Sequence, residues 1–147
     1  NQEWRVYLTT IDKDTPIEQA PHVYRLGWCA DYPDENNWVH EVFNTNAGND
    51  DPRWEETANA PLGPDGKSFN QLTEEAQAEQ DPAARAALYK AAEKILNEDG
   101  AAIAPIYYYT RVQVTKPYLQ RTYYDLGGER IETWVLDEAA KMEATGM

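Results

Sequence analysis

At 147 residues the chain is long enough to bury one hydrophobic core of ordinary size. Its 26 acidic against 13 basic residues give a formal net charge of -13, which argues against nucleic-acid binding because a phosphate backbone requires a basic face. A hydrophobic content of 41% excludes a disordered acidic tail, and the apolar runs are too short to cross a bilayer.

The first residues predict a short helix followed by a strand. Apolar residues with helical spacing form one stripe over residues 4–11. A polar loop bounded by Pro16 and Pro21 separates this helix from residues 22–28, whose apolar and aromatic side chains predict a strand. The stripe of the helix consists of Trp4, Tyr7, Leu8 and Ile11.

A polar turn over residues 29–37 carries the candidate chemistry, because it places carboxylates on both sides of a Tyr-Pro pair. We expect a helix capped by Asn36 or Asn37 to follow. Residues 44–67 are rich in Asn, Asp, Gly and Pro, so they predict a long loop on the surface.

Two helices are predicted next. Ser68 and Gln71 have the spacing of a capping box, which begins the first helix. The pair Asp81-Pro82 supplies a cap and a proline at the first helical position of the second helix, and Gly100 supplies its end. The buried stripe of this second helix is expected to consist of Leu88, Ala91, Ala92 and Ile95.

The last third of the chain has the alternation of strands. Residues 103–114 predict one or two strands, with Pro105 at an edge or bulge, and residues 131–136 predict a last strand. A frayed or weakly helical tail follows over 137–147. Helices and strands in this order predict a mixed α/β or α+β domain over 1–147, with a small mixed sheet flanked by helices.

Four motifs in this order resemble the oligopeptide-binding proteins of ABC importers, which are family 5 extracellular solute-binding proteins. They are the opening NQEW, then WCADYP at 28–33, DPAARAALYKAAE at 81–93 and PIYYY at 105–109. The resemblance implies one lobe of a two-lobed periplasmic-binding-protein-like fold. The resemblance also implies that the chain is the C-terminal portion of a longer protein. Because the chain opens without Met, a basic segment or an apolar run, we interpret it as a fragment or a processed chain.

The resemblance also assigns ligand-binding roles to the turn after the first predicted strand. It implies that Asp31 pairs with the α-ammonium group of a bound peptide, a charge-assisted contact of roughly 1.5 to 3 kcal/mol. It implies that the backbones of Trp28 and Cys29 pair with the peptide main chain as a neighbouring strand does. Read without the family, Asp31 caps a turn before Tyr32-Pro33.

Three further residues match cleft positions of the relatives. Arg25 matches an arginine that can reach a ligand carboxylate through its planar fork, although a surface strand residue is an open alternative. Trp4 and Tyr109 match aromatic residues that line side-chain pockets. Packing in the core is the alternative for both aromatic residues.

The resemblance implies a protein that binds and does not catalyse, located in the periplasm or outside the cell, with lipid anchoring left open. Its implied partners are a peptide ligand, the membrane permease subunits of the importer and the remaining lobe of the longer chain. Self-association of the isolated piece through exposed edges also stays open. Members of the family also carry dipeptides, nickel complexes, haem or sugars, so the fold alone does not identify the cargo.

Two other classes of site are weighed against this interpretation. A carboxylate-based hydrolase would use Asp31 with Asp34 or Glu35. A calcium site would use the oxygen donors Asn44, Asn46, Asn49, Asp50 and Asp51. The loop lacks the spacing of a calcium-binding motif. The single cysteine, Cys29, excludes an intramolecular disulfide and a thiolate-rich zinc site, and we expect a small buried thiol, no metal and no cofactor.

Overall fold

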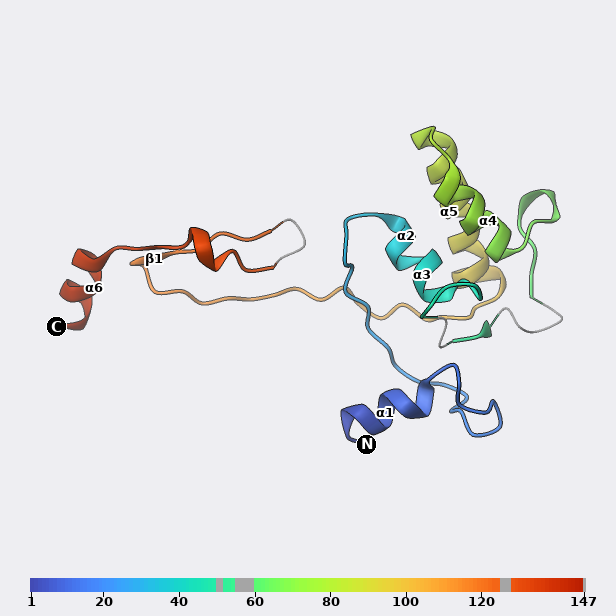
Figure 1. The fold of residues 1–147 in the computed structure, drawn as a ribbon, viewed down its shortest axis with the longest axis horizontal. Coiled ribbons are helices and arrows are strands. Elements are labelled where there is room, and N and C mark those ends of the chain that lie inside the picture. Colours follow the sequence, from blue (N-terminus) through green and yellow to red (C-terminus); the bar gives the residue numbers. More distant parts are fainter. Residues whose placement is uncertain (50–51, 55–59, 125–127, 147) are drawn as a thin grey trace. The chain divides into compact units, whose positions relative to one another are not determined.

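The computed structural model describes residues 1–49, 52–54, 60–124 and 128–146. The chain divides into two compact units, which are best viewed one at a time in Figure 1. The first unit comprises Asn1–Ala30 and Asp34–Pro105, and the second comprises Asp31–Pro33 and Ile106–Met147. Whether both belong to a single domain of a longer protein stays a prediction.

The first unit begins with helix α1, Trp4–Ile11, which confirms the predicted bounds. The Glu3 carboxylate caps it by accepting hydrogen bonds from the amides of Arg5 and Val6, at 2.9 and 3.2 Å. The predicted apolar stripe is only partly covered, since Ile11 is buried while Trp4 is exposed. The amphipathic pattern therefore fixed the helix but not the burial of its apolar face.

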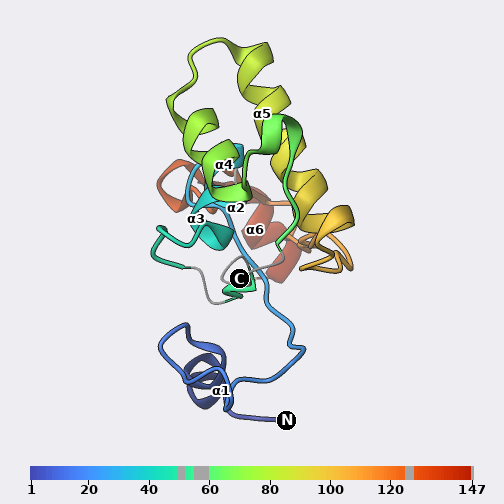
Figure 2. The ribbon, with the colours of Figure 1, turned by 90° about the vertical axis from the view of Figure 1, so that its right-hand side faces the viewer.

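Helices α4 (Phe69–Ala78) and α5 (Pro82–Lys94) lie side by side in both Figure 1 and Figure 2. The capping box of Ser68 is confirmed, because its hydroxyl and the Gln71 side chain each accept a hydrogen bond from the other residue's amide. The Asp81 carboxylate accepts from the Ala84 amide at 2.8 Å, as the predicted cap requires. Beyond α5 the chain forms a π-helical turn, η3 (Ile95–Asp99), and Gly100 ends it as predicted.

The core of the first unit lies between these two helices and the short helices before them. Alanines at Ala76 and Ala92 are fully buried, so α4 and α5 can approach closely. The Trp54 ring packs edge-on against Phe69 with ring centroids 5.3 Å apart. The buried cluster consists of Val39, Phe69, Leu72, Ala76, Tyr89, Ala92, Ile95 and Leu96.

Two short helices, α2 (Glu35–Trp38) and α3 (His40–Phe43), follow the polar turn. The prediction that Asn36 or Asn37 caps this region was wrong, because the Asp34 side chain accepts from the Asn36 amide at 2.8 Å. Both asparagines lie inside α2 and are buried. The predicted surface loop over 44–67 contains a short 3-10 helix, η2 (Pro64–Gly66), among its described residues.

The second unit contains a two-stranded antiparallel sheet and a final helix. Strand β1 (Leu119–Gln120) pairs with β2 (Val135–Leu136) so that Leu119 lies opposite Leu136. The predicted strand over 131–136 is divided, since its first half forms the 3-10 helix η4 (Ile131–Thr133). Helix α6 (Glu138–Thr145), capped by Asp137, occupies most of the predicted tail. The mixed class of helices with a small sheet is confirmed.

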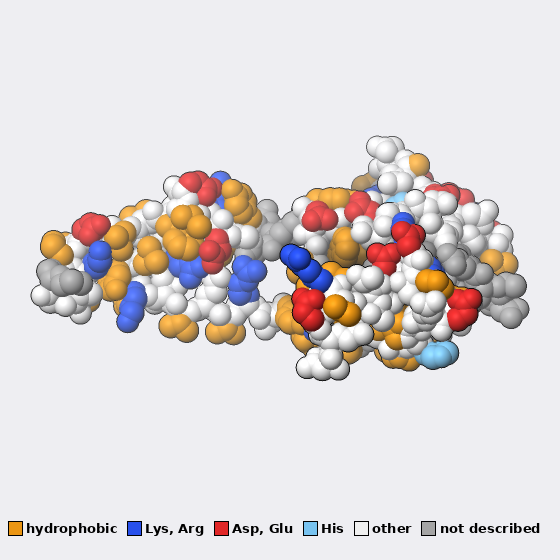
Figure 3. Space-filling view, turned by 60° about the horizontal axis from the view of Figure 1, so that its bottom comes forward, with side chains coloured by type: hydrophobic (Ala, Val, Ile, Leu, Met, Phe, Trp, Pro, Cys, Tyr) orange, Lys and Arg blue, Asp and Glu red, His pale blue; other side chains and the backbone are white. Residues whose placement is uncertain are grey.

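Two predicted strands, over 22–28 and 103–114, were wrong: within the described ranges neither segment pairs in a sheet. A strand needs a neighbour for its backbone hydrogen bonds, and β-branched or aromatic side chains do not supply one. Several side chains of these segments are strongly exposed, by 89% at Val23, 93% at Tyr108 and 95% at Val114. Hydrophobic side chains lie at many points of the surface drawn in Figure 3. Within the described part of the chain, no helix has the length and apolar character needed to span a membrane.

Candidate functional site

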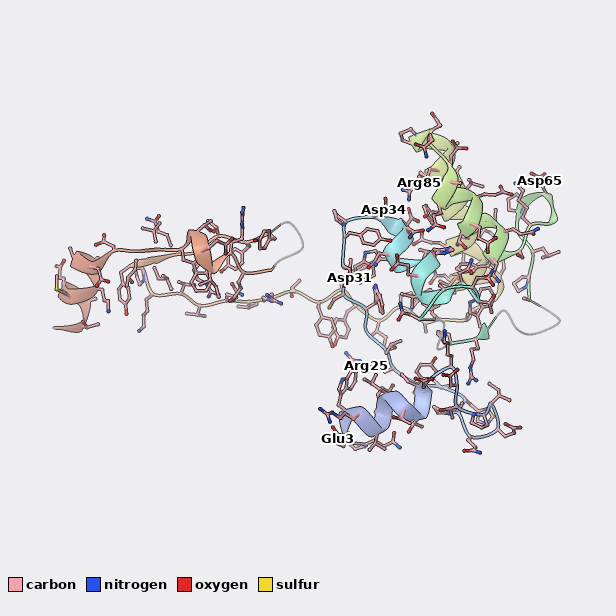
Figure 4. All side chains as sticks on the ribbon, viewed as in Figure 1. Glu3, Arg25, Asp31, Asp34, Asp65 and Arg85 are labelled. Carbon is pink, nitrogen blue, oxygen red and sulfur yellow. The ribbon has the colours of Figure 1, made fainter. Side chains whose placement is uncertain are left out.

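An ion pair holds Asp34, the residue before helix α2, on the helical core. The two terminal guanidinium nitrogens of Arg85, on α5, donate to the two oxygens of Asp34, at 2.7 and 2.9 Å. Figure 4 shows these two labelled side chains close together between α2 and α5. The Arg85 Nε also donates to the Ala76 carbonyl at 3.0 Å, so one side chain connects α2, α4 and α5. Such a two-pronged pair fixes direction as well as distance.

The surroundings of this pair shift the pKa values of the two carboxyl groups at the start of α2, Asp34 and Glu35, in opposite directions. The hydrogen bond from Arg85 lowers the pKa of Asp34 below its ordinary value of 3.8, because it stabilises the charged form. Burial raises the pKa of Glu35, and the like charge of Glu93 adds to that effect. Both Asp34 oxygens accept from Arg85, so this carboxylate is committed to an ion pair rather than to a reacting group.

The indole of Trp28, the residue before the polar turn, contacts helix α2. Its Nε1 donates to the side-chain oxygen of Asn37 at 2.9 Å. Trp28 is half-buried, while the neighbouring Cys29 is exposed, so the prediction of a small buried thiol was wrong. The physical reason is that the ring of Trp28 turns toward α2 and the next side chain along an extended backbone points the other way.

Two of the predicted cleft residues meet around α1. The Tyr7 hydroxyl donates to the backbone carbonyl of Arg25, and the Tyr7 ring stacks on Trp4 with centroids 5.7 Å apart. This brings Trp4 and the backbone of Arg25 to one side of α1, and the side chains of both residues are exposed. Trp4 is not part of the buried core of its unit, so the alternative of core packing is wrong for this residue.

The remaining predicted residues, Asp31 and Tyr109, group with the second unit. Asp31 is exposed. Tyr109 is also exposed and meets the ring of Tyr107 edge-on, with centroids 4.9 Å apart. Its exposure contradicts the alternative of core packing.

The oxygen donors of the possible calcium site do not have the same surroundings. Asn44 is fully buried, and its amide nitrogen donates to the Thr73 hydroxyl at 2.9 Å while its oxygen accepts from the Asn46 amide at 2.8 Å. Its side chain therefore braces α3 against α4. Asp50 and Asp51 lie outside the described residues.

Curated proteins similar to this chain are binding proteins for peptides. The chain is 32% identical over 119 residues to the periplasmic oligopeptide-binding protein OppA of Escherichia coli, covering 81% of this chain and 19% of the relative. It is 30% identical over 149 aligned residues to the oligopeptide-binding protein OppA of Bacillus subtilis, covering 99% and 21%. The resemblance to oligopeptide-binding proteins is confirmed. A further relative is the periplasmic murein peptide-binding protein MppA of Escherichia coli, at 33% identity over 120 residues and 82% and 19% coverage.

The chain thus spans about a fifth of the length of these oligopeptide-binding relatives. No protein-family model matches it, and no solved structure matches it.

The residues that anchor the polar turn were missed by sequence reasoning. Asn37 was read as a helix cap, and Arg85 and Tyr89 were read only as parts of a helical motif. A signal for the last two does exist, because an arginine four residues before a tyrosine places both on one face of a helix. The guanidinium carbon of Arg85 indeed lies 5.0 Å from the centre of the Tyr89 ring.

Proposed function

We propose that this chain is part of the substrate-binding component of an ABC importer, and that the whole protein captures oligopeptides in a cleft between two lobes. The observation that carries this proposal is the similarity to oligopeptide-binding proteins, which extends over 81–99% of the chain. Its similarity to proteins named as binding proteins supports the further proposal that the protein binds its ligand without converting it. The permease subunits of the importer are the expected membrane partners, and the periplasm or cell surface is the expected location.

The proposed peptide contacts lie on the segment that contains Trp28, Cys29 and Asp31. Residues 24–30 form no helix and, within the described ranges, belong to no sheet, so their main chain can add an incoming strand. Contacts to the main chain bind peptides of varied sequence, since they do not read side chains. The exposed Asp31 carboxylate then pairs with the free amino terminus of the peptide.

Three further side chains are proposed to contact the ligand. Arg25 is exposed and carries a guanidinium that suits a ligand carboxylate. Trp4 and Tyr109 supply exposed aromatic surface, which adapts to apolar ligand side chains without demanding one shape. The second wall of the cleft belongs to the remaining lobe of the longer protein, so closure of two lobes completes the site.

The first experiment is native mass spectrometry of the full-length protein, purified without denaturation. Extra mass that resolves into short peptides would support peptide capture and give the length range. Extra mass of a metal complex or a sugar would keep the transport role and replace the cargo. A protein that carries nothing and gains no mass from added peptides would contradict the proposal.

The role of Asp31 is tested by Asp31→Asn in the full-length protein. We expect peptide affinity to fall about 10-fold to 150-fold, which corresponds to the roughly 1.5 to 3 kcal/mol of a charge-assisted contact. The variant should also lose the preference for free over N-acetylated peptides. Asp65→Asn, the same change at another exposed aspartate, is the matched control and should leave affinity unchanged. Equal binding by Asp31→Asn and wild type would refute the assignment.

A further inference from the structure

A partly buried run of polar contacts begins at Trp28, the residue before the exposed Cys29. The Asn37 oxygen accepts from the Trp28 indole at 2.9 Å, and the Asn37 amide nitrogen donates to the Glu41 carboxylate at 2.7 Å. An indole N–H can only donate and a carboxylate can only accept, so the Asn37 amide has one satisfactory orientation. Asn37 is 0% exposed, so its side chain lies at the buried centre of these two partly buried bonds.

The run continues from Glu41 to Asp34. The Asn36 amide nitrogen donates to Glu41 at 3.4 Å, and the Asn36 oxygen accepts from the Tyr89 hydroxyl at 3.1 Å. Arg85 donates to that hydroxyl at 3.3 Å and closes the run with its two bonds to Asp34. Every link lies in the first unit.

We propose that Asn37 and Arg85 are positioning residues that hold the two ends of the peptide-binding segment, residues 28–34, and thereby set peptide affinity. This inference rests on the proposed function of that segment. Trp28 and Asp34 are only six positions apart, and both are tied to the same helical core. A segment with both ends held samples fewer conformations, so less order has to be imposed when the ligand binds.

The test uses the full-length protein with trialanine as the ligand and N-acetyl-trialanine as its blocked counterpart. Arg85→Gln removes the paired bonds to Asp34, and Trp28→Phe keeps an aromatic ring but removes the donor to Asn37. We expect each variant to bind trialanine about tenfold more weakly, the order expected when the backbone of one residue must be newly ordered on binding. The preference for trialanine over the blocked peptide should also shrink, a readout that a loss of stability alone does not change.

Lys94→Gln is the matched control, because Lys94 lies on the same helix and pairs with Asp99 at 2.6 Å on the surface. It should leave both affinities unchanged. Asn37→Leu removes the acceptor of the Trp28–Asn37 hydrogen bond instead of its donor. Because either change breaks the same bond, the double variant Trp28→Phe, Asn37→Leu should bind no more weakly than the weaker-binding single variant.

The outcomes separate this inference from the proposed function. If wild type binds trialanine and the folded Arg85→Gln and Trp28→Phe variants bind it equally well, the positioning role is overturned while peptide capture stands. If the two losses simply add in the Trp28→Phe, Asn37→Leu double variant, the link between these residues is overturned. If wild type binds no peptide, the proposed function fails, and this role fails with it.

Discussion

Tyr89→Phe removes one oxygen from the core of the first unit and leaves the ring in place. Tyr89 is 1% exposed, and its hydroxyl donates to the Asn36 oxygen at 3.1 Å. The ring contacts that the helix pair makes with Tyr89 need no oxygen, so phenylalanine should fill the same space. The substitution therefore removes the hydrogen bond from Tyr89 to Asn36 and leaves the ring packing in place.

The expected cost follows from what each partner loses. The hydrogen bond itself contributes a net 0.5 to 1.5 kcal/mol, roughly, and taking a donor away from a buried oxygen such as that of Asn36 costs about 1 to 3 kcal/mol. Arg85 loses less, because it keeps its two bonds to Asp34 and its side chain is partly open to water. We expect the free energy of opening of the helix pair to fall by about 1 to 3 kcal/mol.

Hydrogen exchange over α5, followed by mass spectrometry, measures that free energy locally. A loss of this size makes amide exchange about 5-fold to 150-fold faster. Tyr108→Phe is the control, since Tyr108 is 93% exposed, and surface changes of this kind stay within about 0.5 kcal/mol. Exchange in Tyr89→Phe that matches Tyr108→Phe would refute the reasoning, because it would mean that the buried hydroxyl stabilises nothing.

Gly63→Ala should destabilise the first unit by about 1 to 3 kcal/mol, because a Cβ there would lie 2.9 Å from Leu72 Cδ1. Gly48→Ala should leave stability unchanged, because a Cβ there would have no atom within 4 Å. Equal midpoints of urea unfolding for the two variants would contradict the close packing at Gly63. The Asp34 pair stabilises the fold above the ordinary pKa of 3.8, and this contribution is lost as pH falls through the lowered folded pKa. On acidification, amide hydrogen exchange over α2 should therefore speed up more in wild type than in Arg85→Gln. Equal increases in the two proteins would argue against a stabilising Asp34–Arg85 pair.

Local interactions made much of the helical structure predictable. The bounds of α1, the capping box at Ser68 and the cap at Asp81 all depend on contacts within four residues, and all were correct. The cap before α2 was not predictable in this way. Asn36 and Asn37 have good capping side chains, but their oxygens accept from Tyr89 and Trp28 instead, which leaves Asp34 as the cap.

The candidate site shows the same division. Motifs alone indicated the resemblance to oligopeptide-binding proteins and the roles proposed for Asp31, Trp28 and Cys29, and the comparison with known proteins confirmed the resemblance. The anchoring of their segment through Arg85 was invisible in the sequence, since it lies 51 residues from Asp34. Such pairs are set by how the helices pack.

The sequence by itself determined helices α1, α4 and α5 and the caps at Ser68 and Asp81, because each follows from the chemistry of residues close together in the chain. Only the tertiary structure decided which segments pair, which asparagines are buried and which cation holds the polar turn. The predicted strand over 22–28 makes the difference plain. Its residues favour an extended backbone, but a sheet requires a second strand, and that partner is a property of the fold.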